Sequence, residues 1–270
     1  MSKMSIKVNN DFAQWAVLKS GCDGGNPDGA IWLCGIEWGG GDDVKEIDFS
    51  EQIKNFNKEP ERTEKEHEEV LNNSSKTWTF DHNAYKLISV ICNNQTLNDF
   101  KYNEYAKQKI TYRKNSEFFK LNLYPISFKD TDENLWNSEW QQKTGFPTKH
   151  HYILWCWNNR FKSIKTWINQ NNPPKLIICA GKTLLQDFLM AFVDQENTAF
   201  ENNMTFEKIE DRELTWLRIN KDRTILCVTP FLTNSRGLNS LERINSMGLR
   251  IREICDRELG NSWIPETLTN

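Results

Sequence analysis

The sequence predicts an α/β fold, a three-layer α/β/α sandwich around a short, mainly parallel four-stranded central sheet. Four short apolar runs indicate buried strands, and helical patterns lie between them. Continuous apolar runs are typical of parallel strands that are covered on both faces. Strands that alternate with helices favour a parallel sheet. No repeat or low-complexity linker divides the 270 residues, so we expect one domain over residues 1–270.

In chain order, the first expected helix covers residues 11–19, with Asp11 as a cap, and the first strand is Ala30–Cys34. The densely charged stretch that follows belongs to a segment, 57–77, expected to be a mobile loop or an insertion. Its charged residues favour a solvated helix or loop, and a lid beside a site is the alternative. Apolar residues at helical spacing then predict a helix over 82–93.

The second strand is expected at Phe118–Leu123 and is followed by a Trp- and Ile-rich helical stretch, 149–170. The third strand, Leu176–Ala180, leads into a helix over 182–193. A further pattern at 204–219 predicts a hairpin or an edge strand.

The fourth strand, Thr224–Val228, precedes a long helix over roughly 239–259. Asn239 followed by Glu242 resembles a capping box at the start of this helix. The expected sheet therefore has four strands in parallel.

The composition argues against a membrane protein and against a metal site. Hydrophobic residues make up 38%, and no apolar run approaches the ~20 residues of a spanning helix. The seven cysteines are an odd number without a C-x-x-C pair, which favours buried free thiols in a reducing cytoplasm. None of the four histidines forms an i, i+4 pair, so we expect no metal and no cofactor.

Glycine, proline or polar residues follow each expected strand. Ligands of a parallel sheet bind beyond the carboxyl ends of its strands. The stretch Gly181-Lys182-Thr183 is not a phosphate-binding P-loop, because that loop needs a glycine where Leu176 stands. The other three stretches are Gly35–Asp43, Asn122–Pro125 and Thr229–Gly237.

The order of these motifs resembles the uracil-DNA glycosylase superfamily over roughly residues 26–255. The family's first motif, G-x-N-P-G or G-E-A-P-G, corresponds to G-I-E-W-G at 35–39. Phe80 matches the aromatic residue that stacks on a flipped base, and Asn122 matches the asparagine that reads the base edge. The family's final H-P-S motif and the loop that enters the duplex correspond to T-P-F and the stretch to Arg236.

Three departures from the family motifs surround the expected pocket. Glu37 stands at the asparagine or aspartate position, Trp38 replaces the proline, and Thr229 replaces the histidine. The resemblance implies a monofunctional DNA glycosylase that flips a pyrimidine and hydrolyses its N-glycosidic bond. The target is uracil or a hypermodified phage base such as glucosylated hydroxymethylcytosine, and the second would make the protein an anti-phage defence enzyme.

The resemblance also assigns roles to residues. A carboxylate near the sugar stabilises the developing cation and orients water, and a hydroxyl donates to the leaving base. The catalytic candidates are Glu37 and Thr229, with Asp42, Asp43 and Asp81 as fallback carboxylates. The substrate-binding candidates are Trp38, Phe80, Asn122 and Tyr124. The DNA-binding candidates are Gly39, Gly40, Asn234, Ser235 and Arg236.

Other interpretations of these residues stay open. Phe80 is equally compatible with a core position, and Asn122 with a role that only ties loops together. Basic residues that would add positive charge to a cleft rim are Lys107, Lys109, Arg113, Lys114, Lys143, Lys149, Arg160, Lys162 and Lys165. We expect a cytoplasmic monomer with DNA as its partner. The rivals are an inactive nucleic-acid-binding protein on the same fold and an enzyme that acts on a small nucleotide.

Overall fold

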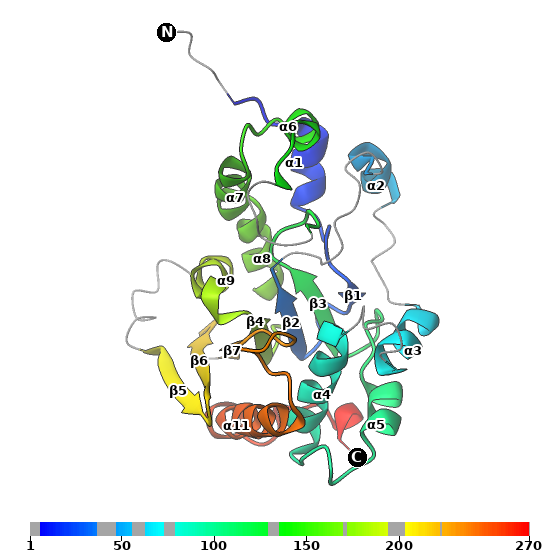
Figure 1. Ribbon diagram of the computed structural model, residues 1–270, viewed down its shortest axis with the longest axis vertical. Helices are drawn as coiled ribbons and strands as arrows, with labels where there is room; N and C mark the ends of the chain where they lie inside the picture. The colour runs from blue at the N-terminus through cyan, green and yellow to red at the C-terminus, as the bar shows by residue number, and fades with distance from the viewer. Residues whose placement is uncertain are drawn as a thin grey trace.

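The structure, a computed structural model, describes residues 6–36, 47–55, 63–72, 79–128, 135–169, 172–193, 203–221 and 223–269 (Figure 1). The strands are β1 (Gly24–Gly25), β2 (Ile31–Gly35), β3 (Phe118–Asn122), β4 (Leu176–Ala180), β5 (Thr205–Ile209), β6 (Arg212–Ile219) and β7 (Thr224–Thr229). The α-helices are α1 (Asn10–Ala16), α2 (Phe49–Asn55), α3 (Glu64–Asn72), α4 (Thr79–Asn93), α5 (Tyr102–Lys109), α6 (Ser138–Thr144), α7 (Lys149–Asn158), α8 (Arg160–Ile168), α9 (Leu185–Phe192) and α11 (Leu241–Leu259). Two short 3₁₀ helices are η3 (Lys182–Leu184) and η4 (Glu266–Leu268).

The fold is α/β, but the sheet is larger and more mixed than the sequence predicts. Within the described residues it has seven strands in the order β1-β3-β2-β4-β7-β6-β5. The four expected strands form its centre and run parallel. The strands β1, β6 and β5 extend it with antiparallel pairs. The prediction of a four-stranded sheet is therefore wrong in size, because the hairpin at 204–219 joins the same sheet.

Helices cover both faces of the sheet. Side chains alternate along each central strand, so Trp32 and Cys34 face one apolar cluster while Ile31 and Leu33 face the other. The first cluster is completed by α1, α2 and α6 to α9, and the second by α3, α4, α5 and α11 (Figure 1). This double cover explains why the central strands are mostly apolar, with Lys120 and Asn122 of β3 among the exceptions.

Two expected helix starts are wrong by one or two residues. The cap of α1 is Asn9, whose side chain accepts hydrogen bonds from the amides of Asp11 and Phe12. The cap of α11 is Ser240, which accepts from the amide of Arg243, so Asn239 and Glu242 do not form the expected box. In the stretch 149–170, the chain breaks at Asn159 into α7 and α8.

Arg160 begins α8 at the centre of the molecule and is fully buried. Its guanidinium donates to two carbonyls at the end of β3, those of Leu123 at 2.6 Å and Asn122 at 2.9 Å. It also donates to the carbonyls of Ala16 at 2.6 Å, Leu18 at 3.1 Å and Ser20 at 2.7 Å. Arg160 thereby holds the end of α1 and the residues after it against the end of β3. The expectation that Arg160 adds positive charge to a cleft rim is wrong, because the side chain is buried.

The same expectation for Lys149 is wrong for the same reason. Lys149 is buried, with its ammonium 4.2 Å from the centre of the Phe128 ring.

The helix α3 places part of the charged 57–77 segment against α4 and α5. Val70 is fully buried, and His67 lies between the Tyr85 hydroxyl, 3.1 Å from Nδ1, and the carbonyl of Lys107, 3.3 Å from Nε2. His82 of α4 lies with Nδ1 3.0 Å from the carbonyl of Val70. Glu64–Asn72 is therefore a docked helix, while 57–62 and 73–77 lie outside the described residues.

Among the described residues no helix is long and apolar enough to cross a membrane. All seven cysteines are buried and free, as predicted.

We predict that replacing Arg160 destabilises the fold strongly. Arg160→Lys keeps the charge, but a lysine ammonium cannot donate to all five carbonyls that the planar guanidinium of Arg160 reaches in several directions. Buried carbonyls left without donors cost about 1–3 kcal/mol each, so we expect a loss of about 3 kcal/mol or more. Urea unfolding measures it, with Arg223→Lys at an exposed position as the control. Equal stability of the two variants would contradict the role of Arg160.

We also predict that His82 makes stability depend on pH. Burial and the nearby charge of Lys86 lower the pKa of His82 below its ordinary 6.5. The unfolded chain then binds this proton more tightly, so stability falls as the pH drops below about 6.5. Unfolding measured at pH 7 and pH 5 should show a smaller loss for His82→Gln than for the wild type. Gln141→Asn, at an exposed position of α6 without a titratable group, should keep the wild-type loss.

Candidate functional site

The carboxyl ends of the four parallel strands lie at one edge of the sheet, at Gly35, Asn122, Ala180 and Thr229. The segment after β2 carries Glu37, Trp38, Gly39 and Gly40, with the fallback carboxylates Asp42 and Asp43 behind them. All of these lie outside the described residues, and their roles stay predictions.

Asn122 lies at this edge and joins the ends of β2 and β3. Its side-chain amide donates to the carbonyl of Gly21 at 3.0 Å. Its Oδ1 lies so close to Gly35 that a Cβ there would come within 2.3 Å of it, which explains the glycine. Asn122 is 4% exposed, so in this structure its amide holds the strand ends and the Gly21 loop together.

Tyr124 follows β3 but points into the apolar cluster on the α7–α9 side. Its hydroxyl donates to Oδ1 of Asp187 at 2.5 Å and accepts from the indole of Trp157 at 2.8 Å. Burial, together with the charge of Asp187, raises the pKa of Tyr124 far above its ordinary value. Because Phe80 packs on the opposite cluster, the structure does not bring Tyr124 and Phe80 together.

Thr229 ends β7 and is fully buried. Its hydroxyl lies 3.3 Å from the carbonyl oxygen of Cys179 and 3.0 Å from that of Pro230. The hydroxyl proton is thus directed at backbone carbonyls, away from solvent.

Phe80 lies in the first turn of α4, beside a buried ion cluster. Its ring is 5.3 Å from that of Phe231, which follows β7 and is 40% exposed. The ammonium of Lys120 is 5.4 Å from the centre of the Phe80 ring. Lys120 forms ion pairs with Asp23 and, at 2.7 Å, with Asp81.

This ion cluster joins three parts of the chain. Lys120 projects from the middle of β3, Asp23 precedes β1, and Asp81 follows Phe80 in α4. Lys120 and Asp81 are 6% and 4% exposed, and buried charges of this kind persist only when they are paired. Sequence reasoning missed Lys120, although a lysine inside an apolar strand run is itself a signal that an acidic partner must lie nearby.

The segment 230–240 connects β7 to α11 and carries three of the five predicted DNA-binding residues. Asn234, Ser235 and Arg236 are exposed, and Arg236 makes no hydrogen bond or ion pair with the described part of the chain. Two buried leucines, Leu232 and Leu238, anchor the segment. Asn83 of α4 donates to both of their carbonyls, at 2.6 and 3.4 Å, which places this segment next to the first turns of α4.

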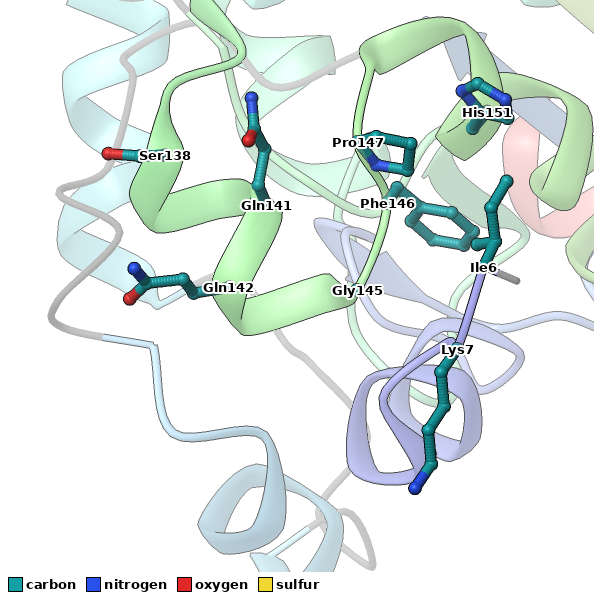
Figure 2. A pocket seen from close by; sticks show the side chains of 9 residues that line it. All are labelled: Ile6, Lys7, Ser138, Gln141, Gln142, Gly145, Phe146, Pro147 and His151. Atoms are coloured by element: carbon teal, nitrogen blue, oxygen red, sulfur yellow. The ribbon is translucent and has the colours of Figure 1, made fainter. Parts of the chain in front are cut away.

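A separate shallow pocket of about 490 Å³ lies against α6 and the start of α7 (Figure 2). Most of its lining side chains are exposed, among them Lys7, Gln141 and Gln142. It lies far from α4 and the 230–240 segment (Figure 1), and it has no buried charged group to direct chemistry.

Over the ranges that the structure describes, no cluster of three or more histidine, cysteine or acidic side chains has the geometry of a metal site. No family model, curated protein or solved structure matches this chain.

We predict that Lys120→Met destabilises the protein by about 3–5 kcal/mol at pH 7, because it leaves two carboxylates without their ammonium. The double variant Lys120→Met/Asp81→Asn should recover part of the loss. Denaturant unfolding measures both. Lys182→Met breaks a lysine–carboxylate pair whose side chains are about half exposed, with Glu213, and should cost less than about 1 kcal/mol. An equal cost for the two lysine variants would contradict the buried cluster.

Proposed function

We propose that the protein is a monofunctional DNA glycosylase that acts on a pyrimidine base flipped out of DNA. One juxtaposition carries the proposal. Phe80, an aromatic ring that is partly exposed, lies beside the buried cluster of Lys120 and Asp81 and in contact with Phe231. Phe231 belongs to the segment that carries the exposed Arg236.

Each part of this arrangement meets a requirement of base excision. The scissile bond is inaccessible in a duplex, so the base must leave the stack, at a cost of a few kcal/mol. Stacking of the flipped base on an aromatic face such as that of Phe80 contributes about 1–3 kcal/mol of binding free energy, which offsets part of this cost. The exposed guanidinium of Arg236 suits contact with a phosphate or with a groove edge.

The chemistry requires an acidic group near the sugar. Cleavage places positive charge on the sugar and negative charge on the leaving base, and a carboxylate stabilises the former. Glu37 remains our candidate for this group. Asp81 is the fallback candidate that lies within the described residues, one residue from Phe80 and ion-paired with Lys120. The ammonium of Lys120 is engaged by two carboxylates, which disfavours it as a nucleophile and agrees with cleavage by water alone.

The four central parallel strands support the resemblance to the uracil-DNA glycosylase superfamily, on which the choice of a pyrimidine rests. The target is uracil or a hypermodified phage base such as glucosylated hydroxymethylcytosine. The second target would make this a cytoplasmic anti-phage defence enzyme.

A second candidate is a nucleic-acid-binding protein that keeps the fold without the chemistry. The position of Thr229 favours it, because a fully buried hydroxyl directed at two carbonyls does not reach a leaving base without rearrangement. In the glycosylase, the leaving base would then need another donor or would depart as the anion.

We predict abasic-site formation on one of three DNA substrates: plain, uracil-containing or glucosylated phage DNA. Alkali converts each abasic site into a strand break that a denaturing gel counts. Glu37→Gln should slow the reaction by about 10²–10⁴-fold, and Glu51→Gln, at an exposed position of α2, should not. Binding without breaks on any substrate would favour the second candidate. No affinity for DNA at all would leave an enzyme of small nucleotides.

A further inference from the structure

The stretch from Phe231 to Leu238, called the arginine loop below, turns most of its carbonyls inward. Two of them are bonded within the loop: the amide of Leu238 donates to Phe231 and that of Gly237 donates to Asn234, both at 2.8 Å. The side-chain amide of Asn83 donates hydrogen bonds to the carbonyls of Leu232 and Leu238. Six of the eight carbonyls therefore accept hydrogen bonds, once those of Ser235 and Gly237 are included.

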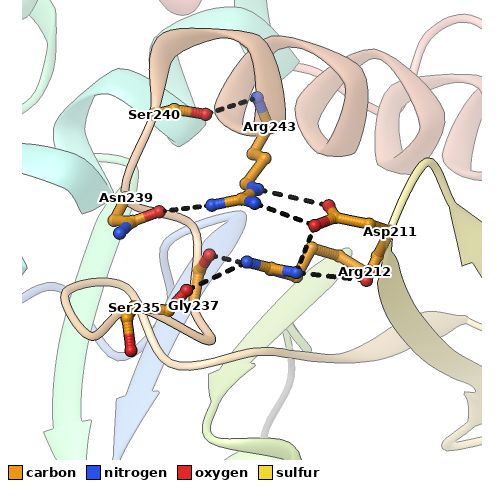
Figure 3. A network of polar contacts seen from close by, with 7 residues as sticks. All are labelled: Asp211, Arg212, Ser235, Gly237, Asn239, Ser240 and Arg243. Atoms are coloured by element: carbon orange, nitrogen blue, oxygen red, sulfur yellow. Dashed lines mark hydrogen bonds and ion pairs between the residues drawn. The ribbon is translucent and has the colours of Figure 1, made fainter.

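These last two carbonyls are both held by Arg212 of β6. Its Nε donates to Gly237 and its Nη2 to Ser235, each at 3.0 Å (Figure 3). A side chain at Gly237 would collide with the carbonyl of Phe231, 1.9 Å from the Cβ position. The backbone therefore packs so tightly that only glycine fits there.

Arg212 is itself fixed from the side away from the loop. Its Nη1 donates to Oδ2 of Asp211 at 2.5 Å, and Arg243 of α11 donates to the same oxygen at 2.8 Å (Figure 3). Arg243 also donates to Asn239 at 2.7 Å. Hydrogen bonding to Arg243 and the charges of both arginines hold the pKa of Asp211 below its usual value, so the carboxylate stays charged between them.

The loop is consequently polarised. Its acceptors face the protein, whereas the backbone N–H groups of residues 232–236 make no hydrogen bond with any described residue. The exposed side chains of Asn234, Ser235 and Arg236 stand on the same stretch. The unbonded amides of the exposed residues 234–236 stand beside the guanidinium of Arg236, and such a concentration of donors suits an anion.

We propose that Arg212 is the positioning residue of this surface: by holding the carbonyls of Ser235 and Gly237, it presents the loop amides and Arg236 to the DNA backbone. This inference rests on the proposed function and deepens it. Arg212 itself does not touch the DNA. Its guanidinium acts through the loop, while Asp211 and Arg243 keep it in place.

A double-mutant cycle tests the positioning role. The probe is a fluorescent duplex that contains a tetrahydrofuran abasic-site analogue, and its Kd is measured by anisotropy at several KCl concentrations. Arg236→Gln should reduce the salt slope by about one, as expected for one lost phosphate contact. Arg212→Gln should weaken binding about tenfold and reduce the slope equally. The double variant should bind no more weakly than Arg212→Gln alone, because Arg212→Gln already removes the contact of Arg236.

Arg218→Gln is the matched control, because Arg218 lies on the same strand and is ion-paired with Glu258. It loses the same charge and should keep the wild-type Kd and slope. Should Arg212→Gln fail to fold, Arg212→Lys replaces it. A lysine keeps the charge but cannot hold both carbonyls, so it should show a reduced slope as well.

Wild-type affinity and slope in the folded Arg212 variant would overturn the inference, and so would losses that add to those of Arg236→Gln. Either result leaves the glycosylase proposal standing if abasic sites still form. Wild-type protein without affinity for the duplex would overturn both. Hydrogen exchange gives a second readout: the amides of Gly237 and Leu238 should exchange faster in Arg212→Gln than in Arg218→Gln.

Discussion

The buried guanidinium of Arg160 is the constraint on which the rest of the candidate site depends. It satisfies five backbone carbonyls in two segments that are distant in sequence, the stretch after α1 and the end of β3. Both segments contribute to the edge where the parallel strands end. Asn122 donates to Gly21 across the same junction, which the pairing of β1 with β3 also holds. A fully buried cation with no carboxylate among these hydrogen-bond partners is costly to desolvate. Its five hydrogen bonds and the Trp167 ring, whose centre is 6.0 Å from the guanidinium carbon, offset that cost.

Three side-chain arrangements meet around the first turns of α4. Lys120 fixes Asp81 and lies beneath Phe80, Asn83 takes two carbonyls of the arginine loop, and Phe231 packs on Phe80. The aromatic pair, the buried charges and the exposed residues 234–236 of the arginine loop thus lie near one helix end. An enzyme of free nucleotides would not need the exposed segment that carries Arg236, and this is why we favour a DNA substrate.

The central strands could be predicted because burial on both faces leaves a direct mark on sequence: five consecutive apolar residues, as in Leu176–Ala180. Local spacing also predicted the hairpin at 204–219, but it could not show that β6 pairs with β7, because pairing is a long-range choice. The same limit applies to side chains. Nothing local distinguishes a surface arginine from Arg160, or predicts that Tyr124 turns towards Asp187 and that Lys120 meets Asp81. The predicted capping residues of α1 and α11 were wrong because neighbouring polar residues compete for the cap position, which Asn9 and Ser240 occupy.

The central claim, that an everted base lies against Phe80, is tested most directly by photocrosslinking. A duplex with a single 5-iodouracil opposite guanine is irradiated with the protein, and mass spectrometry identifies the crosslinked residue. The account predicts a crosslink at Phe80 or Phe231, and its loss when an unlabelled duplex competes. Crosslinks confined to the pocket between α6 and α7, or to the outer face of β5, would contradict it.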